Sequence, residues 1–117
     1  MTNLAGLKPR RKAERNKGNP AYLAAVRELP CVICTEWGMP QLSETTAHHP
    51  IHGRFSQRRV PDEMAIPLCD GHHQGLWDAS KIALHKEPSK WRRMYGEDHE
   101  FTAPTQDKLA HLLRGSK

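Results

Sequence analysis

Apolar residues recur at helical spacing near both ends of the chain. Residues 19–29 form a predicted helix that Pro30 ends, and residues 104–114 form the last predicted helix. Their apolar faces are expected to consist of Tyr22, Leu23, Val26 and Leu29, and of Leu109, Leu112 and Leu113. An amphipathic helix of this kind packs one side against a core.

The middle of the chain has shorter patterns that predict a hairpin followed by helices. Residues 45–51 and 63–68 are predicted strands, joined by the loop 53–61. After Cys69, the chain is expected to form a short helix over 70–79 and another over 87–96. These elements predict an α+β fold, with one domain over residues 19–117.

Composition predicts a thin core. The chain has 117 residues, of which 37% are hydrophobic, with nine prolines and eight glycines. A small domain of this kind gains much from a structural metal. The aromatic residues that we expect to fill its core are Trp37, Trp77, Trp91 and Tyr95.

Charge points to a polyanionic partner. Lys and Arg number 18 against 13 acids, which gives a net charge of +5 and a pI near 9.4. Residues 1–18 are strongly basic and are expected to be a flexible arm, which either is simply solvated or binds nucleic-acid phosphates. No apolar stretch is long enough for a membrane span, so we expect no membrane partner and a cytoplasmic location.

The three cysteines have the spacing of a zinc knuckle. Cys31 and Cys34 form C-x2-C, and Cys69 and His72 form C-x2-H. Two intervening residues allow a tight turn to bring both ligands to one tetrahedral ion. A CxxC redox pair or buried thiols are alternatives, but a redox pair would give Cys69 no role. The sequence therefore predicts a structural Zn²⁺ site.

Two histidine doublets leave further imidazoles for a second site. Adjacent side chains on a helix differ in direction by about 100°, so His72 and His73 are expected to face different centres. Neighbours on a strand point to opposite faces, and His48 and His49 are interpreted in the same way. One histidine of each doublet is thus a candidate for a second metal centre.

The ordered motifs "AHHPIHG", "IPLC", "HH", "ALHK" and "WRRMYG" resemble phage-type HNH endonucleases, especially the Ref (recombination enhancement function) group. The resemblance covers about residues 29–96. It implies a small ββα-metal, treble-clef-like fold and metal-dependent cutting of DNA by a phage or prophage protein in a bacterial host. It also implies a role in recombination or DNA processing and dependence on a recombinase filament.

The resemblance assigns roles to individual positions. It implies that His49 is the general base and that Asp62 holds the hairpin or orients His49. The implied ligands of the catalytic metal, Mg²⁺, Mn²⁺ or Zn²⁺, are His48, His73 and His85, with Asp78 as the alternative third ligand. The Asn of the HNH motif is absent, since its neighbourhood reads "DEMAIPLC", and Trp77 stands where many HNH enzymes have a further ligand.

This set of residues suits phosphodiester hydrolysis, which needs a deprotonated water and neutralisation of phosphate charge. Imidazole exchanges protons near neutral pH and is therefore a suitable base. The basic residues expected to contact DNA phosphates are Arg54, Arg58, Arg59, Lys86 and Arg92, which implies low sequence specificity. The alternative is a zinc-knuckle DNA-binding or adaptor protein without catalysis.

Overall fold

Short helices surround a two-stranded sheet in the computed structural model, which describes residues 18–51 and 60–115. In chain order the elements are α2 (Pro20–Arg27), α3 (Val32–Glu36), β1 (Thr45–His48), η2 (Asp62–Met64), β2 (Ile66–Cys69), α4 (Asp70–His73), α5 (Pro88–Tyr95), η3 (Asp98–Phe101) and α6 (Thr102–Gly115). This is a small, compact α+β structure, as predicted. Residues 1–17, which make up most of the predicted arm, lie outside the described residues.

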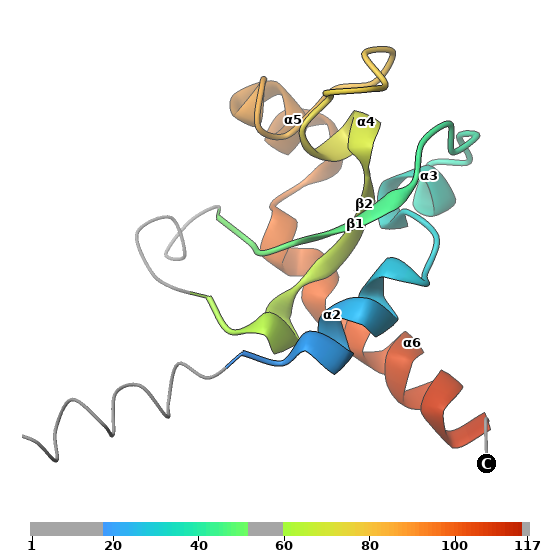
Figure 1. Cartoon of the computed structure of the whole chain (residues 1–117). Helices are drawn as coiled ribbons and strands as arrows, with labels where there is room; N and C mark the ends of the chain where they lie inside the picture. Colours follow the sequence, from blue (N-terminus) through green and yellow to red (C-terminus); the bar gives the residue numbers. More distant parts are fainter. Residues whose placement is uncertain (1–17, 52–59, 116–117) are drawn as a thin grey trace, which may run out of the picture.

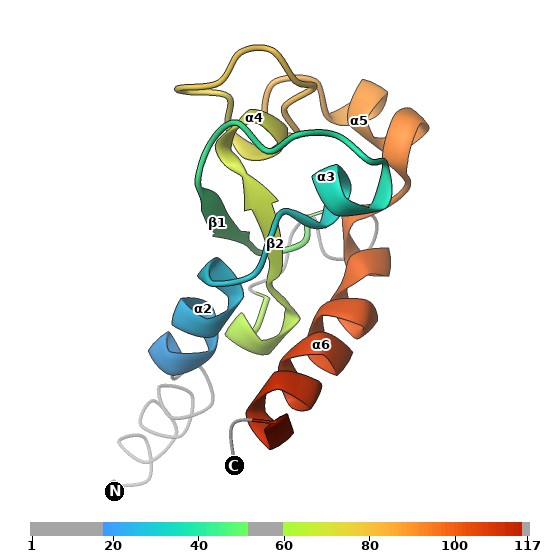
Figure 2. The ribbon, with the colours of Figure 1, turned by 90° about the vertical axis from the view of Figure 1, so that its right-hand side faces the viewer.

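The sheet is the centre of this arrangement. Strands β1 and β2 are antiparallel, and their register places Thr45 opposite Cys69 and His48 opposite Ile66. Helices α2 and α6 lie toward one end of the hairpin, and α4 and α5 lie toward the other (Figures 1 and 2). The last residue of β2, Cys69, leads directly into α4, so the hairpin and this helix form one continuous unit.

The buried apolar side chains form two clusters. The larger one joins α3, β2 and α5 and includes Ile33, Leu68, Leu84 and Trp91. The smaller one consists of Val26, Leu29 and Leu109, which joins α2 to α6. Because both clusters are small, a further crosslink would contribute a large share of the stability.

The helix of residues 19–29 and the helix of residues 87–96 are confirmed to within two residues at each end. Asn19 caps α2 by accepting a hydrogen bond from the Tyr22 N–H at 3.1 Å. Gly96 ends α5 with φ 104°, a backbone angle that favours glycine.

Both strands differ in extent from the prediction. Strand β1 ends at His48 rather than at residue 51, since the Ile51 N–H donates to Asp98 at 2.6 Å instead of pairing with β2. Strand β2 begins at Ile66, because the preceding Asp62–Met64 segment forms a 3-10 turn with the Ala65 N–H bonded to the Asp62 carbonyl at 3.0 Å.

The helix predicted over 70–79 is four residues long. Its first residue, Asp70, is buried, and its carboxylate accepts hydrogen bonds from the N–H groups of Leu76, Trp77 and Asp78 at 3.2, 2.6 and 2.9 Å. Burial raises the pKa of Asp70, but these donors outweigh it and hold the pKa below its ordinary value. The carboxylate thus folds the chain back into a loop where the helix would continue.

The prediction for the aromatic residues is right for two and wrong for two. Trp91 and Tyr95 are buried in the larger cluster. Trp37 is 43% exposed, and Trp77, which lies on the loop held by Asp70, is 87% exposed. On α6, Leu109 is buried as predicted, whereas Leu112 is exposed. No helix among residues 18–51 and 60–115 has the length and apolarity to cross a membrane.

Candidate metal centres

Three thiols and one imidazole meet where three elements join. Cys31 precedes α3, Cys34 lies within it, Cys69 ends β2 and His72 lies in α4. All four residues are buried, and the cysteines are not joined as disulfides. Nδ1 of His72 lies 3.6, 3.6 and 3.4 Å from the sulfur atoms of Cys31, Cys34 and Cys69.

These distances fit a tetrahedral cation. A zinc ion with Zn–S of about 2.3 Å and Zn–N of about 2.0–2.1 Å requires about 3.8 Å between sulfurs and about 3.5 Å between sulfur and nitrogen. The sulfur atoms of Cys34 and Cys69 are 3.8 Å apart, and the three sulfur–nitrogen distances are 3.4–3.6 Å. The Cys3His cluster can therefore bind a metal such as zinc.

Local electrostatics favour a thiolate in this cluster. Hydrogen bonding from Cys31 lowers the pKa of Cys69 to about 3, with a further contribution from His72, while the same interaction raises the pKa of Cys31. The Cys34 N–H also points to the Cys31 sulfur at 3.5 Å. Thiolates are the form in which cysteines bind metal ions.

A second cluster consists of the three imidazoles of His48, His73 and His85. The ring centroids are 4.9 Å apart for His48–His73 and His73–His85 and 5.6 Å apart for His48–His85. One ring nitrogen of each lies within 4.8 Å of the others. Backbone hydrogen bonds position His85, because the N–H groups of Leu84 and His85 donate to the carbonyls of His72 and His73, both at 3.0 Å.

The hydroxyl of Thr46 determines which nitrogen of His73 carries the proton. Its oxygen is 2.7 Å from the Leu68 carbonyl and 2.7 Å from Nδ1 of His73. The carbonyl can only accept, so the single hydroxyl proton goes to Leu68 and Nδ1 of His73 must donate. The lone pair of a neutral His73 is then on Nε2. Burial and the neighbouring His48 and His85 lower the pKa of His73 to about 3, so this neutral form is the one present at pH 7.

The carboxylate of Asp98 determines which ring nitrogen of His48 carries the proton. Nε2 of His48 lies 2.8 Å from Oδ2 of Asp98, and both side chains are almost fully buried. A carboxylate accepts, so the proton of a neutral His48 is on Nε2 and the lone pair is on Nδ1. Carboxylate–histidine pairs of this type orient the imidazole ligands of metal ions.

His49 is paired with Asp62 beside the histidine cluster. Its Nε2 lies 2.8 Å from Oδ1 of Asp62, and its side chain is 38% exposed. Oδ2 of Asp62 accepts a hydrogen bond from the Asn19 N–H at 2.6 Å, which fixes the carboxylate against α2. His49 is close enough to His73 to contribute to the lowering of its pKa. The pair leaves Nδ1 of His49 as the proton-accepting nitrogen.

Residues 7–112 match the model of a family described as "Protein of unknown function (DUF968)". The chain belongs to the DUF968 family. No curated protein and no solved structure matches it. Every residue of both clusters falls within the part of the chain that the DUF968 match covers.

The remaining predicted residues of this DUF968 chain lie in different settings. Asp78 is outside the histidine cluster and accepts hydrogen bonds from Ser80, so the structure places His85 and not Asp78 beside His48 and His73. Nζ of Lys86 donates to the Gly75 carbonyl at 2.7 Å, and Arg92 is exposed on α5. The three remaining arginines that were predicted to contact DNA, Arg54, Arg58 and Arg59, lie outside the described residues.

Sequence reasoning missed Thr46 and Asp98. Thr46 precedes His48 by two positions on β1, and residues two apart share a strand face, so this spacing was an available signal. Asp98 is 50 residues from His48, and nothing in the local sequence connects the two.

Proposed function

We propose that this protein is a metal-dependent DNA endonuclease of the HNH type, which hydrolyses phosphodiester bonds with low sequence specificity in phage DNA recombination or processing. The observation that carries the proposal is the convergence of His48, His73 and His85 beside the His49–Asp62 pair. A cluster of imidazoles whose tautomers are set by outer partners, next to a carboxylate-oriented histidine, is typical of metal-assisted hydrolysis.

The arrangement of the elements supports a ββα-metal interpretation. Strand β1 carries His48, His49 follows it, and α4 carries His73 directly after β2. In this proposal the Cys3His cluster holds a structural Zn²⁺, and the histidine cluster holds a catalytic ion such as Mg²⁺, Mn²⁺ or Zn²⁺. The two adjacent histidines of α4 then belong to different centres.

His49 would act as the general base. Nδ1 of His49 takes a proton from water, whose oxygen attacks phosphorus, and Asp62 stabilises the imidazolium that forms. The P–O3′ bond breaks as the new P–O bond forms, and the 3′ oxygen is protonated from solvent. His48, His73 and His85 would hold the divalent ion, which when bound would neutralise charge that develops in the reaction.

Basic residues would hold the phosphate backbone. Arg92 is exposed on α5, and the whole chain has a net charge of +5. Contacts to phosphates carry no base identity, which supports low sequence specificity.

A plasmid-nicking assay tests the function. The wild-type protein is expected to convert supercoiled DNA to the nicked or linear form with added Mg²⁺ or Mn²⁺, and not in their absence. His73→Ala removes a proposed ligand and is expected to abolish cutting while the Cys3His cluster stays loaded, as measured by zinc content. His111→Ala, a substitution of an exposed histidine on α6, is the matched control and is expected to cut like the wild type.

The rival function is a zinc-knuckle DNA-binding or adaptor protein. It predicts that wild type and His73→Ala bind DNA equally and that neither cuts with any of the divalent ions. That result would overturn the nuclease proposal.

Asp98→Asn is expected to weaken the binding of a divalent ion to the histidine cluster by about 10- to 100-fold. The amide can donate as well as accept, so it no longer fixes the proton on Nε2 of His48. Calorimetric titration with Mn²⁺ measures the change in affinity, and Asp107→Asn on the exposed side of α6 is the control. Unchanged Mn²⁺ affinity would show that Asp98 does not orient a ligand.

A further inference from the structure

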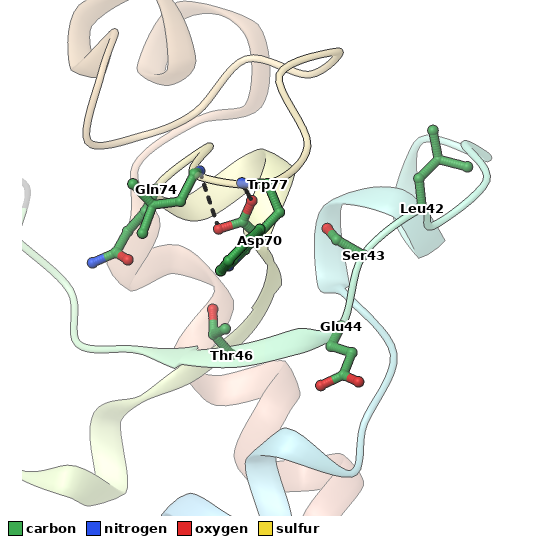
Figure 3. Close-up of a pocket in the computed structure, with 8 residues that line it drawn as sticks. Leu42, Ser43, Glu44, Thr46, Asp70, Gln74 and Trp77 are labelled. Carbon is green, nitrogen blue, oxygen red and sulfur yellow. Dashed lines mark hydrogen bonds between the residues drawn. The ribbon is translucent and has the colours of Figure 1, made fainter.

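A pocket of about 520 Å³ lies beside β1, between the segment that leads into this strand and the loop after α4. The residues that line it include Leu42, Glu44, Thr46, Gln74, Leu76 and Trp77 (Figure 3). Its volume is within the range of about 300–1,000 Å³ that is usual for sites that hold organic ligands.

The apolar lining of this pocket is unusually exposed. Leu42, Leu76 and Trp77 are 63%, 69% and 87% exposed, the three highest values among the large apolar side chains of the described residues. Exposed apolar side chains that line one pocket are candidates for contact with a ligand.

The exposed indole is held on a well-anchored loop. The carboxylate of Asp70 accepts hydrogen bonds from the backbone N–H groups of Leu76 and Trp77, as the dashed lines in Figure 3 show. Gly75 at φ 66° supports the turn. Ordering this backbone in advance reduces the entropy lost when a ligand stacks on the ring.

The pocket adjoins the histidine cluster. Thr46 lines the pocket and its hydroxyl contacts Nδ1 of His73 at 2.7 Å, while Gln74 of the lining directly follows His73 in the chain. The pocket and the histidine cluster thus meet at Thr46 and His73, and under the proposed function the pocket would be offered to a nucleotide next to the phosphate at the cluster.

The charges around the pocket differ from those inside it. The cations beside the loop suit the phosphates of a DNA strand, and the pocket itself suits an uncharged nucleobase. Lys81 packs against Gly71, and Nζ of Lys86 donates to the Gly75 carbonyl, so two cations border the loop. The carboxylate of Asp70 lines the pocket and would repel a phosphate there, whereas the Glu44 carboxylate points away from Asp70 and Thr46 (Figure 3). A flat, uncharged base that stacks on Trp77 and meets polar groups at its edge suits these surroundings.

We infer that this pocket binds an unpaired base of the DNA strand beside the cut, so that the preferred substrates are single-stranded or partly unpaired DNA. This rests on the proposed nuclease function for the position of the cut. A base stacked within a duplex cannot enter such a pocket, because it must first leave its neighbours.

Fluorescence anisotropy without added Mg²⁺ or Mn²⁺ tests the inference separately from catalysis. The probes are a labelled 12-nucleotide oligo(dT) strand and a 12-base-pair duplex, each titrated with the zinc-loaded protein. Trp77→Ala is expected to raise the Kd for the single strand about tenfold and the Kd for the duplex less than twofold. Trp77→Phe keeps an aromatic face and is expected to recover most of the affinity.

Leu112→Ala, which removes an exposed apolar side chain on α6, is the matched control and is expected to change neither Kd. Equal weakening for both probes, or no change for either, would overturn the inference. Loss of self-association in Trp77→Ala, seen by sedimentation with unchanged DNA affinity, would assign the pocket to a protein contact and overturn it as well. If base binding follows the expectation but no metal supports cutting, the nuclease proposal and the placement beside a cut fail, while the binding of an unpaired base by the pocket stands.

Discussion

Cys69→Ser is expected to abolish cooperative unfolding of the domain and to leave it without bound zinc. Structural zinc contributes about 10–16 kcal/mol of apparent free energy in small zinc domains, whereas a whole domain is stable by about 5–15 kcal/mol. Cys69 is fully buried and links β2 to α4, so its loss would break the proposed zinc crosslink at the centre of the fold. Circular dichroism during heating and zinc content by mass spectrometry measure the two effects.

Leu109→Ala provides the comparison for this experiment. It removes a buried side chain from the smaller apolar cluster and is expected to cost about 2–5 kcal/mol while zinc content stays at one ion per chain. The contrary result is a Cys69→Ser protein that unfolds cooperatively, with a decrease in the free energy of unfolding no greater than that of Leu109→Ala. That result would show that the Cys3His cluster is not the main crosslink.

His49→Ala is expected to lower the rate of DNA nicking by about 100- to 10,000-fold, because it removes the proposed general base. The His49 side chain is 38% exposed, and its ring contacts Asp62 near the surface. Its removal is therefore expected to leave the fold intact. DNA affinity and zinc content are expected to stay at wild-type values. Single-turnover nicking with saturating protein isolates the chemical step.

Asp62→Asn separates the base from its orienting group. The amide keeps the contact with His49 but carries no charge to stabilise the imidazolium, so a smaller loss of rate than in His49→Ala is expected. A His49→Ala protein that nicks DNA at the wild-type rate would remove His49 from the mechanism.

Much of this site could be predicted from residue spacing. C-x2-C and C-x2-H constrain ligands locally, because two intervening residues fit a single turn, and the structure places Cys31, Cys34, Cys69 and His72 together. Neighbouring imidazoles diverge on any regular backbone, and His73 does lie in a different cluster from His72. The spacing within each pair and the divergence of adjacent imidazoles depend on local backbone geometry, whereas the joining of the two distant pairs was predicted from the metal ion that they would share.

The parts that sequence reasoning missed depend on contacts between distant residues. Asp98 reaches His48 across 50 positions, and the Asp70 carboxylate ends α4 by binding the backbone of the loop that follows. Trp77 was predicted to be buried because of its residue type, but that loop holds it outward. The pattern of apolar and polar residues along the sequence does not predict contacts between such distant residues.

The backbone links the Cys3His cluster directly to two members of the histidine cluster. His72 and His73 are consecutive, and their carbonyls are bonded to the consecutive residues Leu84 and His85. If the Cys3His cluster holds zinc as proposed, oxidation of its thiols or loss of the ion would therefore be expected to disturb His73 and His85 together. Thiol oxidation and zinc supply would then help to determine whether the histidine cluster can assemble.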